Sequence, residues 1–380
     1  MFYRVSLIHV LFVLSFTVSA GQVVPNPPLI SAKGHILVDY DTGFVISENN
    51  SDILMAPASL TKMMTSYVIG KQILLGNISL DDKVLISEKA WAKNFPDSSK
   101  MFIRVGTEVT VRDLNQGIII ASGNDACVAM AEHIAGSEDA FVVMMNETAQ
   151  QLGMFDTVFV NSHGLDADGQ MTTPLDISIL ASALIRDTPQ EYLIYKQKVF
   201  TYNNIKQYNR NSLLWDKHLV LDGLKTGYTK KAGYSLVSSG LDDGMRLISV
   251  VMGTESKPSR SVESRKLLKY GFRNYISKEL IKPGQSLSQN KVWKGLTDTV
   301  RLAVLDGVTK TIRKGADVTF SIEIELNKEL VAPIRLHERL GYLFVKIDGI
   351  EVSKHPLVSL DGIEEAGFFA RMLDGLLMSY

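Results

Sequence analysis

Ser59-Leu60-Thr61-Lys62 places a hydroxyl and an amine three positions apart, a spacing that suits nucleophilic catalysis. At the start of a helix, residues i and i+3 share a face, so the Lys62 amine can reach the Ser59 hydroxyl. A serine hydroxyl is a weak nucleophile until a neighbouring base takes its proton. The pattern is short, and Ser288-Gln289-Asn290-Lys291 matches it as well. Alone, it marks Ser59 as a candidate nucleophile and Lys62 as a candidate base.

Two further patterns carry polar side chains that could serve the same cleft. Ser122-Gly123-Asn124 falls in a break between helical stretches, where Ser122 could relay a proton and Asn124 could bind an amide. Helix capping would also explain either side chain separately. Lys225-Thr226-Gly227, on an edge strand, would offer an ammonium and a hydroxyl to a carboxylate, with Gly227 removing a side chain that would block approach. A surface turn is the alternative reading of this third pattern.

The elements that must position these residues alternate between strands and helices. Hydrophobic periodicity and turn residues predict them from residue 35 to residue 275. The expected strands are 35–40, 44–47, 221–226, 232–239 and 246–253, and the expected helices are 59–70, 114–152 with its break at 122–124, 173–185 and 261–275.

The pattern changes after residue 276. Apolar side chains alternate with polar ones over 318–326, which predicts a half-buried strand, and Asp348-Gly349 predicts a hairpin turn. We therefore expect a first domain over 21–276 and a small all-β domain over 277–358.

Both ends of the chain carry apolar segments. Residues 1–20 have the features of an export signal: Arg4, an apolar run, and small residues before Gly21. An uncleaved anchor is the alternative, although a membrane span needs about 20 apolar residues. Residues 359–380 predict a helix with one apolar face, which suits either a membrane surface or docking on its own domain.

Composition excludes several classes of protein. The 380 residues include 40 Lys and Arg against 41 Asp and Glu, so no basic excess favours nucleic acid. Cys127 is the single cysteine, which excludes an intrachain disulfide framework and a multi-cysteine metal site. Cys127 itself could be a reactive thiol near the site or a small buried helix residue. The sequence implies neither a metal nor an organic cofactor.

The three patterns, in this order, are the motif set of penicillin-binding proteins and class A β-lactamases. The chain resembles the low-molecular-mass penicillin-binding proteins, specifically the serine D-alanyl-D-alanine carboxypeptidases of the membrane-tethered type. The resemblance extends over nearly the whole mature chain and is carried by residues 56–63, 122–127, 163–166, 209–211, 214–215 and 222–227. It implies an α/β penicillin-binding domain with an antiparallel sheet and a helical cluster, followed by a β domain and an amphipathic tail.

The resemblance also implies a role for each motif residue. Ser59 matches the acylated nucleophile, Lys62 the general base of acylation, and Ser122 the proton relay. The residues that match substrate-binding groups are Asn124 for an amide, Lys225, Thr226 and Gly227 for the carboxylate strand, and Arg210 as a further cation, while the backbone N–H groups of Ser59 and Tyr228 match the oxyanion hole. Lys62 must be neutral to act as a base, and burial and the second ammonium of Lys225 would both favour that state.

The chain departs from the best-known relatives at one position and carries one misleading motif. Tyr228 stands where histidine often follows the third motif, so any role of that side chain is in doubt. Glu323 and Glu325 imitate an acidic motif that supplies the deacylating base in class A β-lactamases. They follow the third motif and fall in an alternating segment, so we interpret them as strand residues and expect no efficient β-lactam hydrolysis.

The function implied is a periplasmic serine carboxypeptidase that trims the terminal D-alanine from peptidoglycan pentapeptide stems through an acyl-enzyme on Ser59. β-Lactams would acylate Ser59, and the C-terminal helix would tether the enzyme to the outer face of the inner membrane. The alternatives are a DD-endopeptidase or weak β-lactamase of the same fold, and a low-activity scaffold that binds the cell wall.

Overall fold

The computed structural model describes residues 10–14 and 25–378. The chain forms two compact units. The first is Pro25–Asn274, and the second contains Tyr275 onward together with a short strand, β1 (Val10–Leu14). The remainder of the expected export signal over 1–20 lies outside the described residues.

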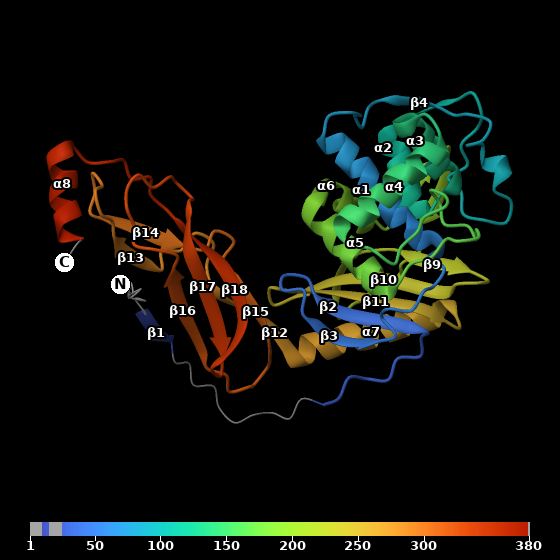
Figure 1. The fold of residues 1–380 in the computed structure, drawn as a ribbon. Helices are drawn as coiled ribbons and strands as arrows, with labels where there is room; N and C mark the ends of the chain where they lie inside the picture. The colour runs from blue at the N-terminus through green and yellow to red at the C-terminus, as the bar shows by residue number, and fades with distance from the viewer. Residues whose placement is uncertain (1–9, 15–24, 379–380) are drawn as a thin grey trace. The chain divides into compact units, whose positions relative to one another are not determined.

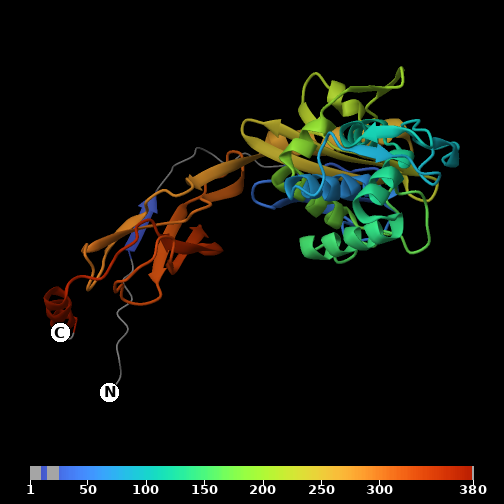
Figure 2. The same cartoon turned by 90° about the horizontal axis from the view of Figure 1, so that it is seen from above.

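The first unit is built on an antiparallel sheet in the order β3-β2-β11-β10-β8, with β9 pairing with β10 beyond the end of β8. Helix α7 (Lys257–Asn274) packs on one face of this sheet, and the other helices cover the opposite face (Figures 1 and 2). The strands are β2 Gly34–Asp39, β3 Val45–Asn49, β8 Val220–Gly223, β9 Thr226–Thr229, β10 Gly233–Asp242 and β11 Met245–Thr254.

The helical cluster surrounds α1, whose residues are buried continuously from Thr61 to Gly70. A helix that is buried on every side has no polar face to offer solvent, so it must lie at the centre of the cluster. The surrounding helices are α2 Val111–Gln116, α3 Asn124–Ala135, α4 Glu138–Leu152, α5 Pro174–Asp187 and α6 Pro189–Tyr195, and small two-stranded sheets add β4 Lys83–Leu85 with β5 Glu108–Thr110 and β6 Val199–Tyr202 with β7 Ile205–Tyr208.

Three expected boundaries in this unit were wrong. The helical stretch 114–152 breaks a second time, because Gly136 ends α3 with a left-handed φ of 78° and the Ser137 side chain caps α4 by accepting from the Ala140 N–H. The single strand expected over 221–226 is two strands, β8 and β9. Helix α7 begins at Lys257 rather than at residue 261.

The second unit is β-rich, as the alternation predicted. Its main sheet has the order β1-β16-β17-β18-β14-β13, and β12 pairs with β15 separately. Ile322, Ile324 and their neighbours in β16 pair in register with β17, which continues through the expected hairpin into β18. The strands are β12 Tyr275–Ile281, β13 Ser288–Lys291, β14 Thr299–Ala303, β15 Val308–Arg313, β16 Phe320–Leu326, β17 Arg339–Ile347 and β18 Ile350–Ser359.

The C-terminal helix is shorter than the apolar pattern suggested. Helix α8 spans Phe368–Leu377. Ile363, which precedes it, forms a bridge with Ile334 and is only 5% exposed, because it belongs to the core of the β unit. The expected helical positions Asp361, Glu364 and Ala366 therefore precede the helix, and Tyr380 lies outside the described residues. Within 10–14 and 25–378, no helix is both long and apolar enough to cross a membrane.

Candidate active site

Ser59 lies in a tight 3₁₀ turn, Ala58–Leu60, that leads directly into α1. Lys62 is in the first turn of α1, and its Nζ donates to Ser59 Oγ over 3.2 Å. The turn is pressed against Gly164, where a Cβ atom would come within 1.9 Å of the Ala58 carbonyl oxygen. Only glycine fits there, so the approach of the two segments fixes where the serine stands.

The Lys62 ammonium is fully buried, and its acceptors are uncharged. Besides Ser59 Oγ, Nζ donates to Asn124 Oδ1 over 2.7 Å and to the His163 carbonyl oxygen. The pKa of Lys62 is lowered from 10.5 to about 8, mainly by burial and less strongly by the Arg210 charge. Burial disfavours the charged form of an amine, so this environment supplies a base close to neutral pH.

Ser122 and Asn124 stand where a π-helical segment, Gly117–Ala121, stops and α3 begins. Ser122 adopts a left-handed φ of 61°, which turns the chain sharply at this point. Its Oγ accepts from Lys225 Nζ over 2.9 Å, while Asn124 Nδ2 donates to Ser98 Oγ over 3.0 Å. The N-cap of α3 is Gly123, with no side-chain cap, so helix capping does not explain the pair.

Lys225 reaches the same place from the strand side. It is 3% exposed, and its pKa lies well below 10.5, first because of burial and second because of the Lys62 charge. The repulsion between the two ammoniums that the sequence predicted is present as a lowering of the pKa of Lys225 by the Lys62 charge, and the Arg210 charge also lowers the pKa of Lys62. Both buried amines therefore lose their proton more readily than an ordinary lysine.

Gly227 serves a different purpose from the one expected. A Cβ at this position would lie 3.2 Å from the Pro57 carbonyl oxygen and 3.3 Å from Leu60 Cγ. The missing side chain thus lets β9 pack against the turn that carries Ser59, rather than clearing space for a ligand. Among the described residues, β9 pairs with β10 alone, which leaves alternate backbone groups of this edge strand facing away from the sheet.

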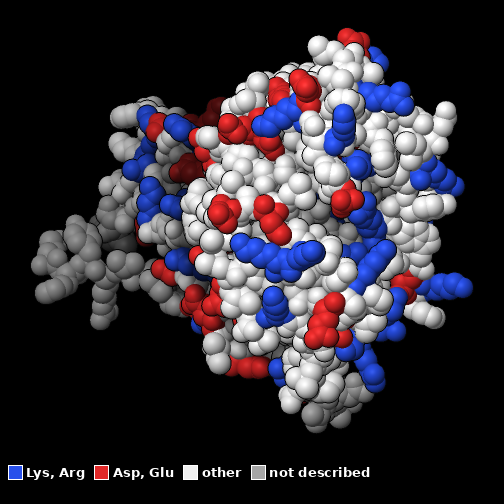
Figure 3. Space-filling model, turned by 90° about the vertical axis from the view of Figure 1, so that its right-hand side faces the viewer, with Lys and Arg blue, Asp and Glu red and all other residues white. Residues whose placement is uncertain are grey.

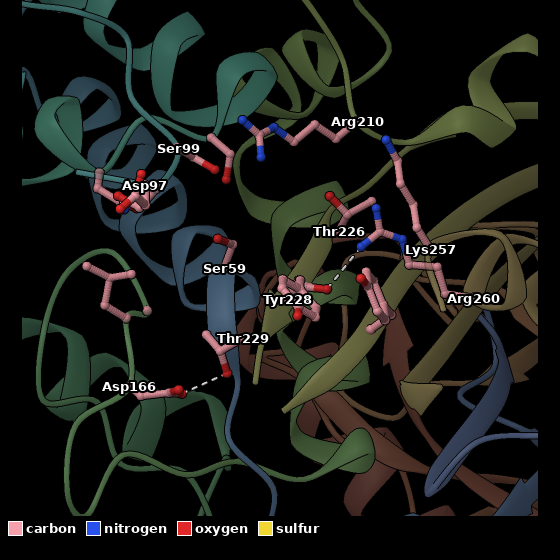
Figure 4. Close-up of a pocket in the computed structure, with 17 residues that line it drawn as sticks. Ser59, Asp97, Ser99, Asp166, Arg210, Thr226, Tyr228, Thr229, Lys257 and Arg260 are labelled. Carbon is pink, nitrogen blue, oxygen red and sulfur yellow. Dashed lines mark hydrogen bonds between the residues drawn. The ribbon is translucent and has the colours of Figure 1, made fainter. Parts of the chain in front are cut away.

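These residues surround one cavity of about 600 Å³ (Figure 4). Lys62 and Lys225 are buried beside it and contact the lining serines. Every candidate site residue predicted from the sequence therefore lies in or directly beside this cavity. The predicted residues that line the cavity are Ser59, Ser122, Asn124, Arg210, Thr226, Gly227 and Tyr228.

Sequence reasoning missed Arg260, which also lines the cavity. It is 5% exposed, and its Nη1 donates to the Gly227 carbonyl oxygen over 3.0 Å. Its guanidinium lies 5.7 Å from the ring centroid of Tyr234, which stacks on Tyr228 at 4.2 Å. No pattern in the sequence marked it, because Arg260 directly precedes the expected helix 261–275 and an isolated arginine usually faces solvent.

Asp125 was also missed, although it lies within the second motif segment. Its carboxylate accepts from the backbone N–H groups of Met101, Phe102 and Ile103 over 2.8, 2.9 and 3.2 Å. These bonds hold the segment that supplies Ser98 to Asn124. Asn209 and Asn211 similarly anchor the backbone on either side of Arg210.

His163 contributes its backbone rather than its ring. The ring stacks edge-on against Phe95, accepts from the Leu165 N–H over 3.2 Å, and lies 3.6 Å from Glu138. Burial and the Lys62 charge lower the pKa of His163 to about 4. The neutral ring therefore holds the 161–166 loop, while its carbonyl oxygen accepts from Lys62.

Basic and acidic side chains are interspersed over the face of the molecule shown in Figure 3.

Cys127 is buried, and burial raises the pKa of its thiol to about 12. This environment favours the second interpretation of Cys127, a small buried helix residue, over a reactive thiol. Among the described residues, no group of three or more His, Cys, Asp or Glu side chains could hold a metal ion.

Comparison with known proteins matches each unit to a family. The model of the D-alanyl-D-alanine carboxypeptidase family matches residues 21–256, and that of the penicillin-binding protein 5 C-terminal domain matches residues 275–365. Two similar curated proteins are the D-alanyl-D-alanine carboxypeptidases DacA of Haemophilus influenzae, 44% identical over 96% of this chain and 94% of that protein, and of Escherichia coli K12, 45% identical over 94% and 90%.

Solved structures agree with the sequence comparison. Penicillin-binding protein 5 from H. influenzae covers 90% of this chain and 100% of its own, at 44% identity and a TM-score of 0.83. Penicillin-binding protein D2 from Listeria monocytogenes in its cefotaxime-bound form covers 65% of this chain and 99% of its own, at 30% identity and a TM-score of 0.59. The chain therefore belongs to the family of serine D-alanyl-D-alanine carboxypeptidases, with a penicillin-binding protein 5 C-terminal domain.

Proposed function

We propose that the enzyme removes the terminal D-alanine from peptidoglycan pentapeptide stems through an acyl-enzyme on Ser59. The observation that carries this proposal is the contact of a buried amine, Lys62, with the Ser59 hydroxyl at the edge of a cavity bordered by cations. A base with a pKa near 8 can take the serine proton at neutral pH, as nucleophilic catalysis requires.

In the proposed acylation reaction, each of these residues has a separate role. Neutral Lys62 takes the Ser59 proton, Oγ attacks the carbonyl carbon between the two D-alanines, and the backbone N–H groups of Ser59 and Tyr228 stabilise the oxyanion. The C–N bond then breaks, and the proton that Lys62 took from Ser59 passes through the Ser122 hydroxyl to the departing amine. Ser122 Oγ also accepts from Lys225 Nζ. An ester on Ser59 remains, and water hydrolyses it.

Substrate binding uses the remaining polar groups. Asn124 can bind the peptide amide on the acyl side, since its side chain lines the cavity between Lys62 and Ser98. The terminal carboxylate is held by Thr226, Lys225 and Arg210. Positive groups on that side favour a free carboxylate over an extended chain, which suits a carboxypeptidase better than an endopeptidase.

β-Lactams acylate the same serine in this proposal. Support comes from the L. monocytogenes relative, whose structure is described as cefotaxime-bound. The motif that imitates a deacylating acid belongs to the other unit: Glu323 lies in β16, where its carboxylate pairs with Lys346 over 2.5 Å. The acyl-enzyme therefore has no base from that segment.

The proposed location is the periplasm, on the outer face of the inner membrane. Helix α8 supports this tether because it has no buried residue, while Asp374 in its polar face accepts from the Lys294 N–H of its own unit over 2.5 Å. The apolar face thus remains open to lipid. Its exposed large side chains are Phe368, Phe369, Met372, Leu373, Leu376 and Leu377.

The test is release of D-alanine from a peptide ending in D-Ala-D-Ala, together with labelling by a fluorescent penicillin. Ser59→Ala should abolish both, because the acylated oxygen is lost. Ser288→Ala is the matched control: Ser288 begins the other sequence with the same spacing, in β13, and should leave both unchanged. Labelling that survives Ser59→Ala would refute the assignment of the nucleophile.

A further inference from the structure

A basic surface lies along residues 196–220, outside the cavity. This segment contains the β6–β7 hairpin and the 3₁₀ turn Ser212–Trp215, and it carries five Lys or Arg residues against one acid. The whole chain, by contrast, has 40 Lys and Arg for 41 Asp and Glu. The five basic side chains are all exposed, and we call the area that they cover the hairpin surface: Lys196, Lys198, Lys206, Arg210 and Lys217.

The one acid of the segment, Asp216, does not neutralise this surface. Its side chain is 4% exposed, and its carboxylate pairs with Arg265 over 2.6 Å and accepts from the His218 N–H over 2.8 Å. Within the described part of the chain, none of the five basic residues takes part in an ion pair. The hairpin surface therefore presents uncompensated positive charge to solvent, which attracts anionic partners.

Two aromatic rings lie among these cations. Tyr208 is 59% exposed and Trp215 is 43% exposed. The Lys206 ammonium lies 5.4 Å from the centroid of the Tyr208 ring, and the Lys198 ammonium lies 5.6 Å from that of Trp215. The Asn209 N–H donates to the Lys198 carbonyl oxygen over 2.9 Å, which joins the two lysine–ring pairs in one surface. Tyr and Trp are enriched where proteins bind other molecules.

The hairpin surface meets the basic side of the cavity at Arg210. This residue follows β7 by two positions and lines the cavity, where Figure 4 shows it on the same side of Ser59 as Arg260. The hydroxyls of Ser212 and Ser261 lie 2.8 Å apart and join the next turn to α7, one residue after Arg260. The surface is therefore continuous with the side at which the proposed function places the terminal carboxylate.

The peptide that is trimmed does not extend onto this surface. Its chain ends at the carboxylate beside Arg210, so no further part of the same stem lies in that direction. A partner of the hairpin surface must therefore bring a second anionic group. In the wall polymer, every neighbouring stem that is not cross-linked ends in a free carboxylate of the same kind.

We infer that the hairpin surface binds a neighbouring strand of peptidoglycan while a stem is trimmed in the cavity. The stem carboxylates of that strand pair with the exposed lysines, and its sugar rings lie against Tyr208 and Trp215. A second attachment to the same polymer raises the effective affinity for it. The inference rests on the proposed function, because that function places the carboxylate end of the substrate beside Arg210.

The test compares two substrates: uncross-linked peptidoglycan strands with pentapeptide stems, and a soluble blocked peptide that ends in D-Ala-D-Ala. The measurement is kcat/KM for release of D-alanine by the full chain. Lys198→Glu combined with Lys206→Glu should lower kcat/KM on the strands roughly three- to tenfold, the range of two exposed charge pairs, and leave the soluble peptide unchanged. The loss should come from KM, and added salt should bring the parent down toward the variant on the strands.

Matched variants separate this surface from the net charge of the chain. Lys33→Glu combined with Lys83→Glu makes the same change of charge at exposed lysines outside both the hairpin surface and the cavity lining, and should leave both substrates unchanged. Tyr208→Ala should lower kcat/KM on the strands alone, by roughly two- to fivefold. Phe155→Ala is its control, because it removes a ring that is 73% exposed elsewhere, and should have no effect.

Three outcomes would overturn the hairpin surface and leave the carboxypeptidase in place. One is an unchanged kcat/KM on the strands in the variant of Lys198 and Lys206. Another is an equal loss in the variant of Lys33 and Lys83, which would show attraction by net charge alone. The third is an equal loss on the soluble peptide, which would show that the lysines act on the cavity.

Binding without catalysis gives an independent readout. The Ser59→Ala chain should sediment with insoluble peptidoglycan, and adding Lys198→Glu and Lys206→Glu should reduce the bound fraction. Loss of binding to anionic lipid vesicles with unchanged binding to peptidoglycan would make a lipid the partner and refute the inference. If neither substrate released D-alanine and Ser59 carried no acyl group, the proposed function would fail, while sedimentation would still decide whether this surface binds the polymer.

Discussion

Lys62 acts at neutral pH because its charge is costly where it is buried. With a pKa of about 8, about a tenth of the amine is neutral at pH 7, against fewer than about one part in a thousand for an ordinary lysine. We predict that kcat/KM on a blocked peptide rises close to tenfold per pH unit below pH 8 and levels off above it. The measurement is a pH profile of D-alanine release.

The control for this profile is a substitution that keeps the positive charge. Lys62→Arg should remove activity at every pH, because a guanidinium does not deprotonate in this range. A profile that stays flat between pH 6 and pH 9 in the unaltered enzyme would show that Lys62 is not the titrating base.

At the residue scale, sequence reasoning found the groups that carry chemistry and missed those that hold them. Ser59 and Lys62 share a helix turn, so their contact follows from local spacing. The contacts of Asp125 with the backbone at 101–103, and of Arg260 with Gly227, join segments that are distant in sequence. No periodicity encodes such a pairing, because it depends on how the elements pack.

At the element scale, a buried acid joins α6 to α2 within the helical cluster. Glu191 is 5% exposed, and its carboxylate accepts from Asn115 Nδ2. Burial raises the pKa of Glu191 from 4.5 to about 7. Between these values the folded protein binds a proton that the unfolded chain does not, so the free energy of unfolding falls as pH rises.

We predict that Glu191→Gln removes this loss of stability. Relative to the parent, the variant should gain up to about 3 kcal/mol in free energy of unfolding between pH 5 and pH 8, from about 1.4 kcal/mol per pH unit. The new amide can also donate to Asn115 Oδ1, which has no hydrogen-bond partner among the described residues. Urea denaturation of both proteins at both pH values measures the difference. An equal offset at the two pH values would contradict the assignment.

The sequence predicted the order and type of most elements, and its errors have local causes. At Gly136-Ser137, α3 ends and α4 begins, but the apolar periodicity continues on both sides, so the sequence predicted one helix there. At the C-terminus, the apolar pattern continued from a bridge residue, Ile363, into α8 without a change of hydropathy. Periodicity records which residues are buried, and a short bridge and a helix can bury the same residues.

At the scale of the whole molecule, all the residues that surround Ser59 belong to Pro25–Asn274, while α8 belongs to the other unit. The residues of the candidate active site and the proposed membrane tether thus lie in separate units of the chain. Removing the attachment should leave the chemistry intact, which makes the tether testable without loss of the enzymatic readout.

We predict that deleting residues from Phe368 onward abolishes binding to lipid vesicles while D-alanine release continues. The deletion must begin there and not at Asp361, because Ile363 is in the core of the β unit. The described helix carries one Arg and one Asp, so binding should come from apolar burial, worth on the order of 1.5 kcal/mol or more per large side chain fully inserted. Binding should therefore persist at high salt and on vesicles without anionic lipid. Phe369→Glu with Leu373→Glu, which keeps the chain length, should reproduce the loss, and vesicle binding by this variant or by the deletion would refute the tether.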